Sequence, residues 1–504
     1  MKYTAFTITT IVAILCNLSK SAYKLKKDKL AITYANTITA AELETHLKVI
    51  ASDEYEGRET GKKGQRMTAE YLKNEFIKDG VAPGNKGSYF QNYPLIETSA
   101  PQATFKFRNE TFSSGEDFYF FNRYANFQSM EISHTNVFDA GYGIKEGDKN
   151  DFGNKLSGKV VFIKAESPKE FKSWNWRKKL AAAKESGALA VFFTSDKFNL
   201  NNEKYHHMLN SPSLSLESKS TKGKSDEIPF FFISDRFYTT VFMEVGEPIE
   251  EEVLNNPFYN YIVFDYISTT KKIESSNVLG FIEGSDDKLK NEIIIITAHY
   301  DHLGIKDGLV YNGADDDGTG TVALLELAEA FQKAKNDGNG PKRSILIMPV
   351  SGEEKGLLGS KYYTENPIYP LANTVVDLNI DMIGRLDENH TKGNYVYLIG
   401  ADKISQELND ISEASNNTYT KLNLDYTFND ENDPNRFYYR SDHYNFVEKG
   451  IPVIFYFSGV HEDYHKHTDV VEKIMFDKVE TITKLVFYTA WEVANKPSRL
   501  KLNE

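Results

Sequence analysis

The chain has 504 residues, more than one ordinary hydrophobic core contains, and this length predicts two to four domains. Hydrophobic residues make up 40% of the chain and aromatic residues 13%, which excludes disorder as the main state. The net charge of −13 argues against non-specific nucleic-acid binding, because such binding requires a basic surface.

The first 22 residues have the pattern of a secretory signal peptide. Met1 and Lys2 precede an apolar stretch that is too short to span a bilayer, and a small-residue segment follows. We therefore expect an exported protein, periplasmic or extracellular. A lipid anchor on Cys16 is less favoured, because the neighbouring Leu15 is bulky where a small residue is required. Beyond this segment no apolar run reaches membrane length, so we expect no transmembrane segment in the mature chain.

Residues 39–78 carry apolar side chains at three- and four-residue spacing, which predicts two amphipathic helices joined by a charged loop. We assign residues 23–115 to the N-terminal part of the main domain. Residues 116–265 have a different sequence pattern from the preceding segment. Short β-rich runs such as KVVFIKA and ALAVFFTSD alternate there with a helix-like stretch. We interpret this segment as a separate β-rich domain without a catalytic constellation. A long polar stretch within it, which contains His206 and His207, reads as a solvated loop.

Residues 266–504 form the main part of the larger domain, where a pattern of apolar strand, loop and helix repeats. Four runs are continuous enough to be buried on both faces, as strands of a parallel sheet are: EIIIITAH, SILIMPVSG, TVVDLNIDM and IPVIFYFSG. TGTVALLELAEAFQKAK and KVETITKLVFYTAWEVAN have the spacing of helices that cover such a sheet. The α/β fold class follows.

Metal-binding types of side chain follow each of the four predicted strands. Ligands of open α/β sheets collect at the carboxyl ends of the strands, so a site is expected there. The motifs are AHYDHLG, SGEEKGLLGS, NIDMIGR and GVHEDYHKHTD, together with the turn YNGADDDGTG. Imidazoles and carboxylates without thiolates suit zinc, and more than four ligands suit two ions that share a bridging carboxylate. The sequence therefore indicates metal-assisted hydrolysis.

Each motif also has an ordinary explanation when it is taken alone. A single histidine after a strand is more often a surface residue, and paired glutamates usually form a solvated loop. Three acids before a helix can act as N-terminal caps, worth about 0.3 to 1 kcal/mol each. Chance does not readily explain four successive strand ends that all bear acids or histidines.

The ordered motifs resemble the co-catalytic dizinc aminopeptidases, a family that includes bacterial leucyl aminopeptidases and glutamate carboxypeptidase-like zinc peptidases. The resemblance covers roughly residues 40–100 and 275–495. It implies a three-layer α/β/α zinc-peptidase domain with a mixed, mostly parallel central sheet. The stretch NVFDAGYG…LSGKVVFIKA resembles a protease-associated (PA) domain, so residues 116–265 are expected to be a β-rich PA-like insertion.

The resemblance implies two Zn²⁺ per chain and assigns their ligands residue by residue. One ion would be held by His299 and Asp381, and the other by Glu354 and His465. Asp316 would bridge the two ions, and a cis peptide bond would follow it. Of the three histidines in HEDYHKHTD, the family's spacing to a later acidic residue selects His465. His302 and His467 are then left as supporting or surface residues.

The resemblance also implies the catalytic roles. Glu353 would be the general base that takes a proton from the metal-bridging water and delivers it to the leaving amine. Asp301 would accept the second N–H of the His299 imidazole and fix its tautomer. Tyr464 matches a tyrosine that, in some relatives, donates to the oxyanion. The stretch RSDHYNF resembles one that lines the substrate site, which adds two candidate substrate-binding residues, Asp442 and His443.

The expected function is that of an exported zinc-dependent exopeptidase, best described as an aminopeptidase that hydrolyses N-terminal residues from peptides. A carboxypeptidase or dipeptidase of the same family is the nearest alternative, because the metal ligands do not define which end of a peptide is bound. A glutaminyl cyclase with a single zinc is less favoured by the complete five-ligand set. A metal-dead binding protein would require a lost ligand or base, and none is missing.

Overall fold

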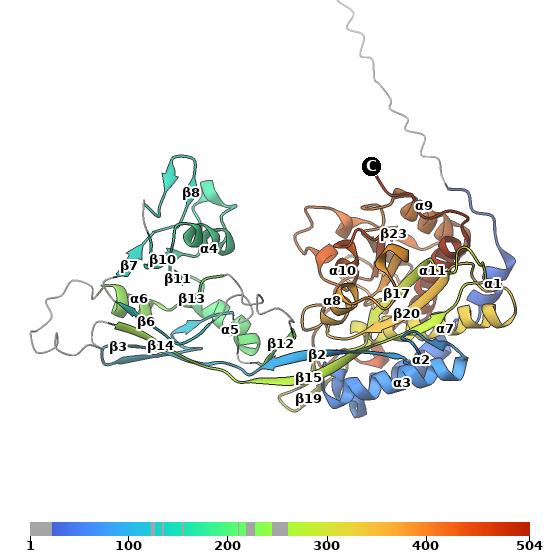
Figure 1. Cartoon of the computed structure of the whole chain (residues 1–504), viewed down its shortest axis with the longest axis horizontal. Coiled ribbons are helices and arrows are strands. Elements are labelled where there is room, and N and C mark those ends of the chain that lie inside the picture. The colour runs from blue at the N-terminus through green and yellow to red at the C-terminus, as the bar shows by residue number, and fades with distance from the viewer. Residues whose placement is uncertain are drawn as a thin grey trace, which may run out of the picture. The chain divides into compact units, whose positions relative to one another are not determined.

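The computed structural model describes residues 23–121, 127–133, 136–153, 156–209, 211–217, 227–243 and 261–504. The expected signal peptide and Cys16 lie outside the described residues. The chain divides into two compact units, one of Met1–Asn92 with Ser275–Glu504 and one of Tyr93–Glu274 (Figure 1). Among the described helices, none has the length and apolar character needed to cross a membrane.

The first unit is built around an eight-stranded sheet. Its four central strands, in the order β20–β17–β21–β24, are parallel to one another and are the four runs expected from the sequence. The flanking β16 and β22 run antiparallel to this block, so the sheet is mixed but mostly parallel, as predicted. In spatial order the strands are β1 (Ala82–Pro83), β16 (Gly280–Ile282), β20 (Ser344–Val350), β17 (Ile293–His299), β21 (Thr374–Ile380), β24 (Val453–Phe457), β22 (Tyr395–Ile399) and β23 (Asn423–Asp425).

Helices cover both faces of this sheet because its strands are apolar on both sides. Along β17, Ile294 and Ile296 pack into one core, whereas Ile293 and Ile295 pack into another. The first core is covered by α1 (Lys29–Ala35), α2 (Ala40–Ile50), α3 (Lys63–Asp79), α7 (Gly320–Asn336), α9 (Gln406–Ser415) and α11 (Phe476–Asn495). The second is covered by α8 (Leu358–Glu365) and α10 (His443–Val447). The three-layer α/β/α expectation is confirmed.

The second unit, Tyr93–Glu274, is wider at both ends than the predicted segment 116–265, because its sheets include β3, β4 and most of β15. One sheet has the order β5–β13–β11–β10–β7 and another β4–β3–β14–β6. Phe105 lies at its centre, with ring centroids 4.7 to 4.9 Å from those of Phe118, Phe231 and Phe264. The identification of this unit as a PA domain stays a prediction.

The polar stretch expected to be a loop instead contains helix α5 (Phe198–Leu209) and strand β12 (Ser213–Leu216). The helix forms because Phe198 and Leu209 pack against the aromatic core of the unit. The remaining elements of this unit and its connections are β2 (Phe90–Thr98), β3 (Gln102–Phe107), β4 (Glu110–Ser113), β5 (Phe118–Tyr119), β6 (Met130–Ser133), β7 (Val137–Asp139), β8 (Lys145–Glu146), β9 (Lys149–Asn150), β10 (Val160–Lys164), α4 (Trp176–Glu185), β11 (Ala190–Thr194), β13 (Phe230–Ile233), α6 (Asp235–Tyr238), β14 (Tyr261–Ile267) and β15 (Thr270–Val278).

Glu326 on α7 is a buried acid of the first unit, with 2% of its surface exposed. Its carboxylate accepts the backbone N–H of Thr39 at 3.1 Å and lies 3.9 Å from His46 Nε2. Burial raises the pKa of this carboxyl from 4.5 to about 8. The folded chain therefore keeps a proton at neutral pH that the unfolded chain releases.

We predict that Glu326→Gln weakens the pH dependence of stability. Between the unfolded pKa of 4.5 and the folded value of about 8, the folded state binds more protons, so the free energy of unfolding of the wild type falls as pH rises. One proton contributes at most about 1.4 kcal/mol per pH unit. Urea titrations across this range should give a shallower fall for Glu326→Gln than for the wild type or the exposed control Glu365→Gln. Equal slopes for all three proteins would contradict the assignment.

Candidate metal centre

The predicted metal ligands and Glu353 lie at the carboxyl ends of the four parallel central strands. His299 is the last residue of β17, and Asp381 directly follows β21. Glu353 and Glu354 follow β20, and His465 lies in the loop after β24. Because these strands are adjacent and parallel, side chains that are far apart in the sequence converge at the same place.

Asp316 lies between two groups of these side chains. Its Oδ1 is 3.3 Å from His299 Nε2, and its Oδ2 is 3.2 Å from His465 Nε2. On the first side, His299 Nε2 is also 3.6 Å from Asp381 Oδ1. On the second side, His465 Nε2 is also 3.3 Å from Glu354 Oε2. The two oxygens of one carboxylate thus face two separate sets of donor atoms.

Asp315 and Asp317, the two neighbours of Asp316 in the sequence, hold the turn Ala314–Thr319, which leads into α7. Asp315 Oδ1 accepts the backbone N–H of Gly384 at 2.6 Å. Asp317 lies near His299 and Asp381, but its carboxylate accepts three backbone N–H groups, those of His299, Gly320 and Met382. Asp469 accepts the N–H groups of Asp315 and Asp316, at 3.0 and 3.1 Å. The peptide bond between Asp316 and Asp317 is cis, as the resemblance implied.

The chemistry of this donor set fits metal cations. Burial opposes the negative charge of Asp316. The neighbouring imidazoles, first that of His302, nevertheless lower the pKa of Asp316 well below its ordinary value. Burial likewise opposes the charge of His299, but carboxylates led by Glu353 raise its pKa well above the ordinary value. Asp316 Oδ2 and Glu354 Oε1 are buried, and each faces an imidazole nitrogen, His465 Nε2 at 3.2 Å and His302 Nδ1 at 2.9 Å respectively. Protons on the imidazoles thus balance the crowded carboxylates, and divalent metal ions can take their place.

A cavity opens onto this cluster, and Glu353 lies in its wall. Burial raises the pKa of the Glu353 carboxyl well above its ordinary value, which makes its ionised form a stronger proton acceptor. Tyr464 also lines the cavity; its hydroxyl accepts a hydrogen bond from Arg440 at 3.3 Å, and its ring stacks on His465. The full lining is His299, Asp316, Glu353, Asp381, Met382, Phe437, Arg440, Phe455, Phe457, Val460, Tyr464 and His465.

Asp301 lies beside His299 Nδ1 as expected, but it faces the imidazole through its backbone carbonyl rather than its carboxylate. His299 Nδ1 lies 3.0 Å from the backbone carbonyl oxygen of Asp301, whereas Asp301 Oδ1 is 3.9 Å away. The carboxylate instead accepts the hydroxyl of Thr60 at 2.6 Å and the backbone N–H of Glu353 at 3.3 Å. A main-chain oxygen therefore orients the imidazole, while the Asp301 side chain joins two loops.

Asp442 and His443, which the sequence suggests for substrate binding, are not among the residues that line the cavity, so that role stays a prediction. Both are fully buried at the start of helix α10, where Asp442 is the N-cap and His443 the first helical residue. Asp442 Oδ1 accepts the hydroxyl of Ser360 at 2.5 Å, and the His443 ring stacks on Phe455, itself a wall residue. From the same stretch, Arg440 reaches the cavity instead.

The histidines of HEDYHKHTD have three different surroundings. His465 alone contacts both Asp316 and Glu354. His461 Nε2 lies 3.3 Å from Asp315 Oδ2, behind the turn. Although His461 and His465 have the spacing H-E-x-x-H, the residues between them form turns, so the two imidazoles do not share one helical face. His467 is exposed.

Arg58 and Thr60 contribute to the site, although the sequence presents them only as parts of a charged loop. The Arg58 side chain is fully buried and donates to four backbone carbonyls, those of Ile50, Tyr300, Asn312 and Gly313. Together with the bond from Thr60 to Asp301, these contacts tie the N-terminal loop to the strand end of His299 and the turn of Asp316. A buried arginine has no local signature that separates it from an exposed one, so only the fold identifies it.

Comparison with known proteins agrees with this geometry. Residues 277–490 match peptidase family M28. A probable zinc metalloprotease of Pyrenophora tritici-repentis is 28% identical over 266 residues, which cover 44% of this chain and 52% of that protein. Aminopeptidase YwaD of Bacillus subtilis is 26% identical over 234 residues, which cover 45% of this chain and 46% of that protein. The chain thus spans about half the length of the curated relatives it matches.

Two solved structures share the fold. An aminopeptidase from Aneurinibacillus sp. strain AM-1 has a TM-score of 0.58 at 19% identity, covering 94% of this chain and 98% of that one. BSAP, a zinc aminopeptidase from Bacillus subtilis, has a TM-score of 0.53 at 19% identity, covering 91% of this chain and 96% of that one. These two likenesses show that the chain shares the fold, and residues 277–490 carry the match to the family.

We predict that Asp316→Asn weakens zinc binding on both sides of this residue, if each side holds an ion. An asparagine presents one neutral oxygen and one N–H₂ group, so neither side of the residue keeps a carboxylate oxygen. Chelator-competition titrations should therefore show both affinities reduced by at least about 10-fold, the smallest loss expected even for a residue that only supports a ligand. Asp307→Asn, at an exposed turn, is the matched control. If only one of the two affinities falls, Asp316 does not serve both ions.

Proposed function

We propose that this chain, which carries a peptidase family M28 domain over residues 277–490, is a two-zinc aminopeptidase that removes N-terminal residues from peptides. The observation that carries the proposal is the position of Asp316, whose two carboxylate oxygens lie 3.3 Å from His299 Nε2 and 3.2 Å from His465 Nε2. A carboxylate so placed can serve two cations at once. Export of the protein is part of the proposal and depends on the N-terminal residue pattern alone.

In this proposal His299 and Asp381 hold one zinc ion, Glu354 and His465 hold the other, and Asp316 is shared. When bound, the ions would polarise the scissile carbonyl and lower the pKa of a bound water. The fixed positions of the ligands support this assignment, because each set comes from a strand end or an anchored loop.

Glu353 is the proposed general base. Its Oε2 lies 3.9 Å from His299 Nε2, and the hydrogen bond from its backbone N–H to Asp301 fixes the start of its loop. The carboxylate would take a proton from the attacking water and pass it to the leaving amine. The raised pKa of Glu353 suits both transfers, because the group gains and loses a proton in the same cycle.

Tyr464 is the proposed oxyanion donor. Its hydroxyl accepts a hydrogen bond from Arg440, which leaves the hydroxyl proton free to be donated towards the cavity. The wall beside it is apolar and suits an apolar side chain of the substrate, because Met382, Phe437, Phe455, Phe457 and Val460 form it.

A second candidate function rests on Arg440, whose guanidinium is in the cavity wall. A guanidinium is well suited to bind a carboxylate in a bidentate manner. If it binds the C-terminal carboxylate of the substrate, the enzyme acts as a dipeptidase or carboxypeptidase. The two candidates differ in whether a free amine or a free carboxylate is required.

We predict that Glu353→Gln binds both zinc ions but loses at least about 100-fold in kcat, the lower range for loss of a general base. The glutamine keeps the size of the side chain but cannot accept and return the proton. Zinc content by atomic absorption and steady-state hydrolysis of leucyl-anilide measure the two effects separately. Glu388→Gln, an exposed glutamate in the loop after Asp381, should behave as the wild type. Retained turnover in Glu353→Gln would exclude it as the base.

We predict that aminoacyl-anilides are cleaved, that their N-acetylated forms are not, and that a zinc chelator abolishes the activity. A dipeptide and its C-terminal amide should be cleaved with similar kcat/KM if the enzyme binds the N-terminus. A strong preference for the free carboxylate, lost in Arg440→Met, would instead support the second candidate. Cleavage of N-acetylated peptides from the C-terminus would overturn the aminopeptidase proposal.

A further inference from the structure

His461 is a buried histidine in the loop that follows β24, and the proposed function gives it no role. Its Nε2 lies 3.3 Å from Asp315 Oδ2, and only 2% and 0% of the two side chains are exposed. Its Nδ1 accepts the backbone N–H of Asp463 at 3.2 Å. A neutral imidazole carries a single proton, so the proton of His461 is on Nε2 and faces the Asp315 carboxylate.

This contact joins the two chain segments that carry the proposed ligands Asp316 and His465. Asp315 directly precedes Asp316 in the turn Ala314–Thr319. His461 lies four positions before His465, in the loop of residues 461–469. The imidazole therefore connects the turn to the loop close to a proposed ligand on each side.

The loop needs such a connection because His465 has a backbone φ of 57°. Residues other than glycine rarely adopt this left-handed conformation, so the surrounding structure must hold it. The far end of the loop is tied to the turn, since the Asp469 carboxylate accepts the backbone N–H groups of Asp315 and Asp316 at 3.0 and 3.1 Å. His461 provides the matching contact at the near end of the loop.

The turn depends less on this contact than the loop does. Asp315 Oδ1 also accepts the backbone N–H of Gly384 at 2.6 Å and the hydroxyl of Thr319 at 3.0 Å. These bonds do not involve the loop, so they can hold the Asp315 side chain when the imidazole is removed.

The near end of the loop has further partners, but they belong to other segments. The Asp463 carboxylate accepts the Arg385 guanidinium at 2.9 Å and the Lys473 ammonium at 2.7 Å. Neither cation is part of the turn Ala314–Thr319. Removal of the His461 imidazole would thus free the near end of the loop to shift relative to the turn.

We propose that His461 is a positioning residue, which fixes the loop of His465 against the turn of Asp316 and so sets the affinity for the zinc ion on the His465 side. This inference rests on the proposed two-zinc function. The ion proposed on the His299 side takes no ligand from this loop, so its affinity should not depend on His461. A residue that served only the stability of the unit would not distinguish the two ions.

Two substitutions separate the two contacts of the imidazole. A glutamine places its amide near the position of Nε2 and can donate to Asp315, whereas the shorter asparagine places its amide near Nδ1. Chelator competition should show that His461→Asn lowers one zinc affinity about 10-fold and leaves the other unchanged. The affinity that falls should be the one that His465→Ala also lowers. His461→Gln should bind both ions as the wild type does.

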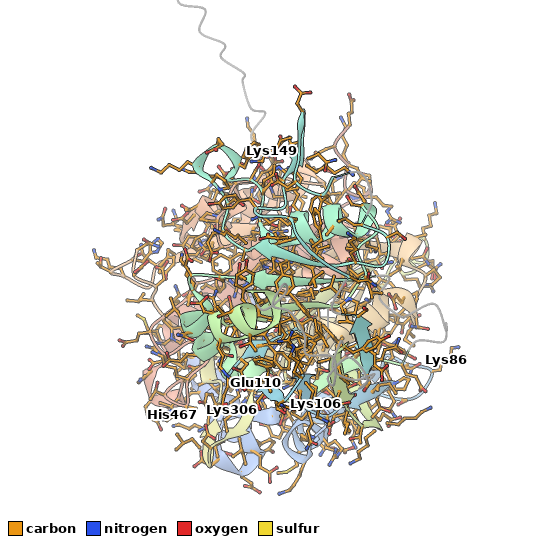
Figure 2. The ribbon with its side chains drawn as sticks, turned by 90° about the vertical axis from the view of Figure 1, so that its left-hand side faces the viewer. Lys86, Lys106, Glu110, Lys149, Lys306 and His467 are labelled. Carbon is orange, nitrogen blue, oxygen red and sulfur yellow. The ribbon has the colours of Figure 1, made fainter. Side chains whose placement is uncertain are left out.

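The matched control is His467→Asn, because this exposed histidine, labelled in Figure 2, belongs to the same loop. It should keep both wild-type affinities. Wild-type affinities in His461→Asn, or an equal loss for both ions, would overturn the proposal. A loss in His461→Gln as large as that in His461→Asn would also overturn it, because the contact of Nε2 would then not be the cause.

Hydrogen exchange of the metal-free proteins tests the positioning without zinc. Peptides that cover residues 461–469 should exchange faster in His461→Asn than in His461→Gln or the wild type. Peptides from α7 should exchange equally in all three proteins, which checks that the variants fold. Equal exchange of the loop in all three folded proteins would overturn the proposal. A wild type that binds a single zinc ion would instead contradict the proposed function, so the two failures are distinguishable.

Discussion

The structure of the first unit depends on one electrostatic constraint, the burial of many carboxylates at the carboxyl edge of a parallel sheet. Asp301, Asp315, Asp316, Asp317 and Asp469 are all buried within this region. Isolated buried charges are strongly unfavourable, so each group needs a hydrogen-bond donor, a cation or a proton. The surrounding loops provide these partners, and metal ions fit where the carboxylates of Asp316 and Glu354 face imidazoles.

Backbone N–H groups satisfy the carboxylates that do not face the imidazoles of the proposed metal ligands. Asp317 and Asp469 each bind at least two of them, and in doing so they fix the turn that carries Asp316. Arg58 adds a buried positive charge, and it donates to carbonyl groups rather than to a carboxylate. Its charge acts on the acids at a distance while its hydrogen bonds hold the loops. The N-terminal helices and their connecting loop therefore belong to the site as much as the strand ends do.

The four histidines around this turn also differ in the carboxylates that they face. His299 and His465 face the two oxygens of Asp316, His461 is paired with Asp315, and His302 faces Glu354. Of these four histidines, His299 and His465 line the cavity, whereas His302 and His461 do not. The imidazoles on both sides of Asp316 therefore face the cavity.

The sequence by itself determined the α/β class, the four central strands and the residues that converge on Asp316. Buried parallel strands are continuously apolar, and ligands collect at their carboxyl ends. Short, local sequence motifs therefore indicate both the strands and the site residues. Only the tertiary structure decided the surroundings of His302, Arg58, Asp301 and Asp442. Burial and hydrogen-bond partners depend on chain segments tens to hundreds of positions apart, and no local pattern distinguishes a buried histidine or arginine from an exposed one. For the same reason the sequence of α5 predicts a polar loop. The helix forms only because it packs against an aromatic core whose residues come from elsewhere in the chain.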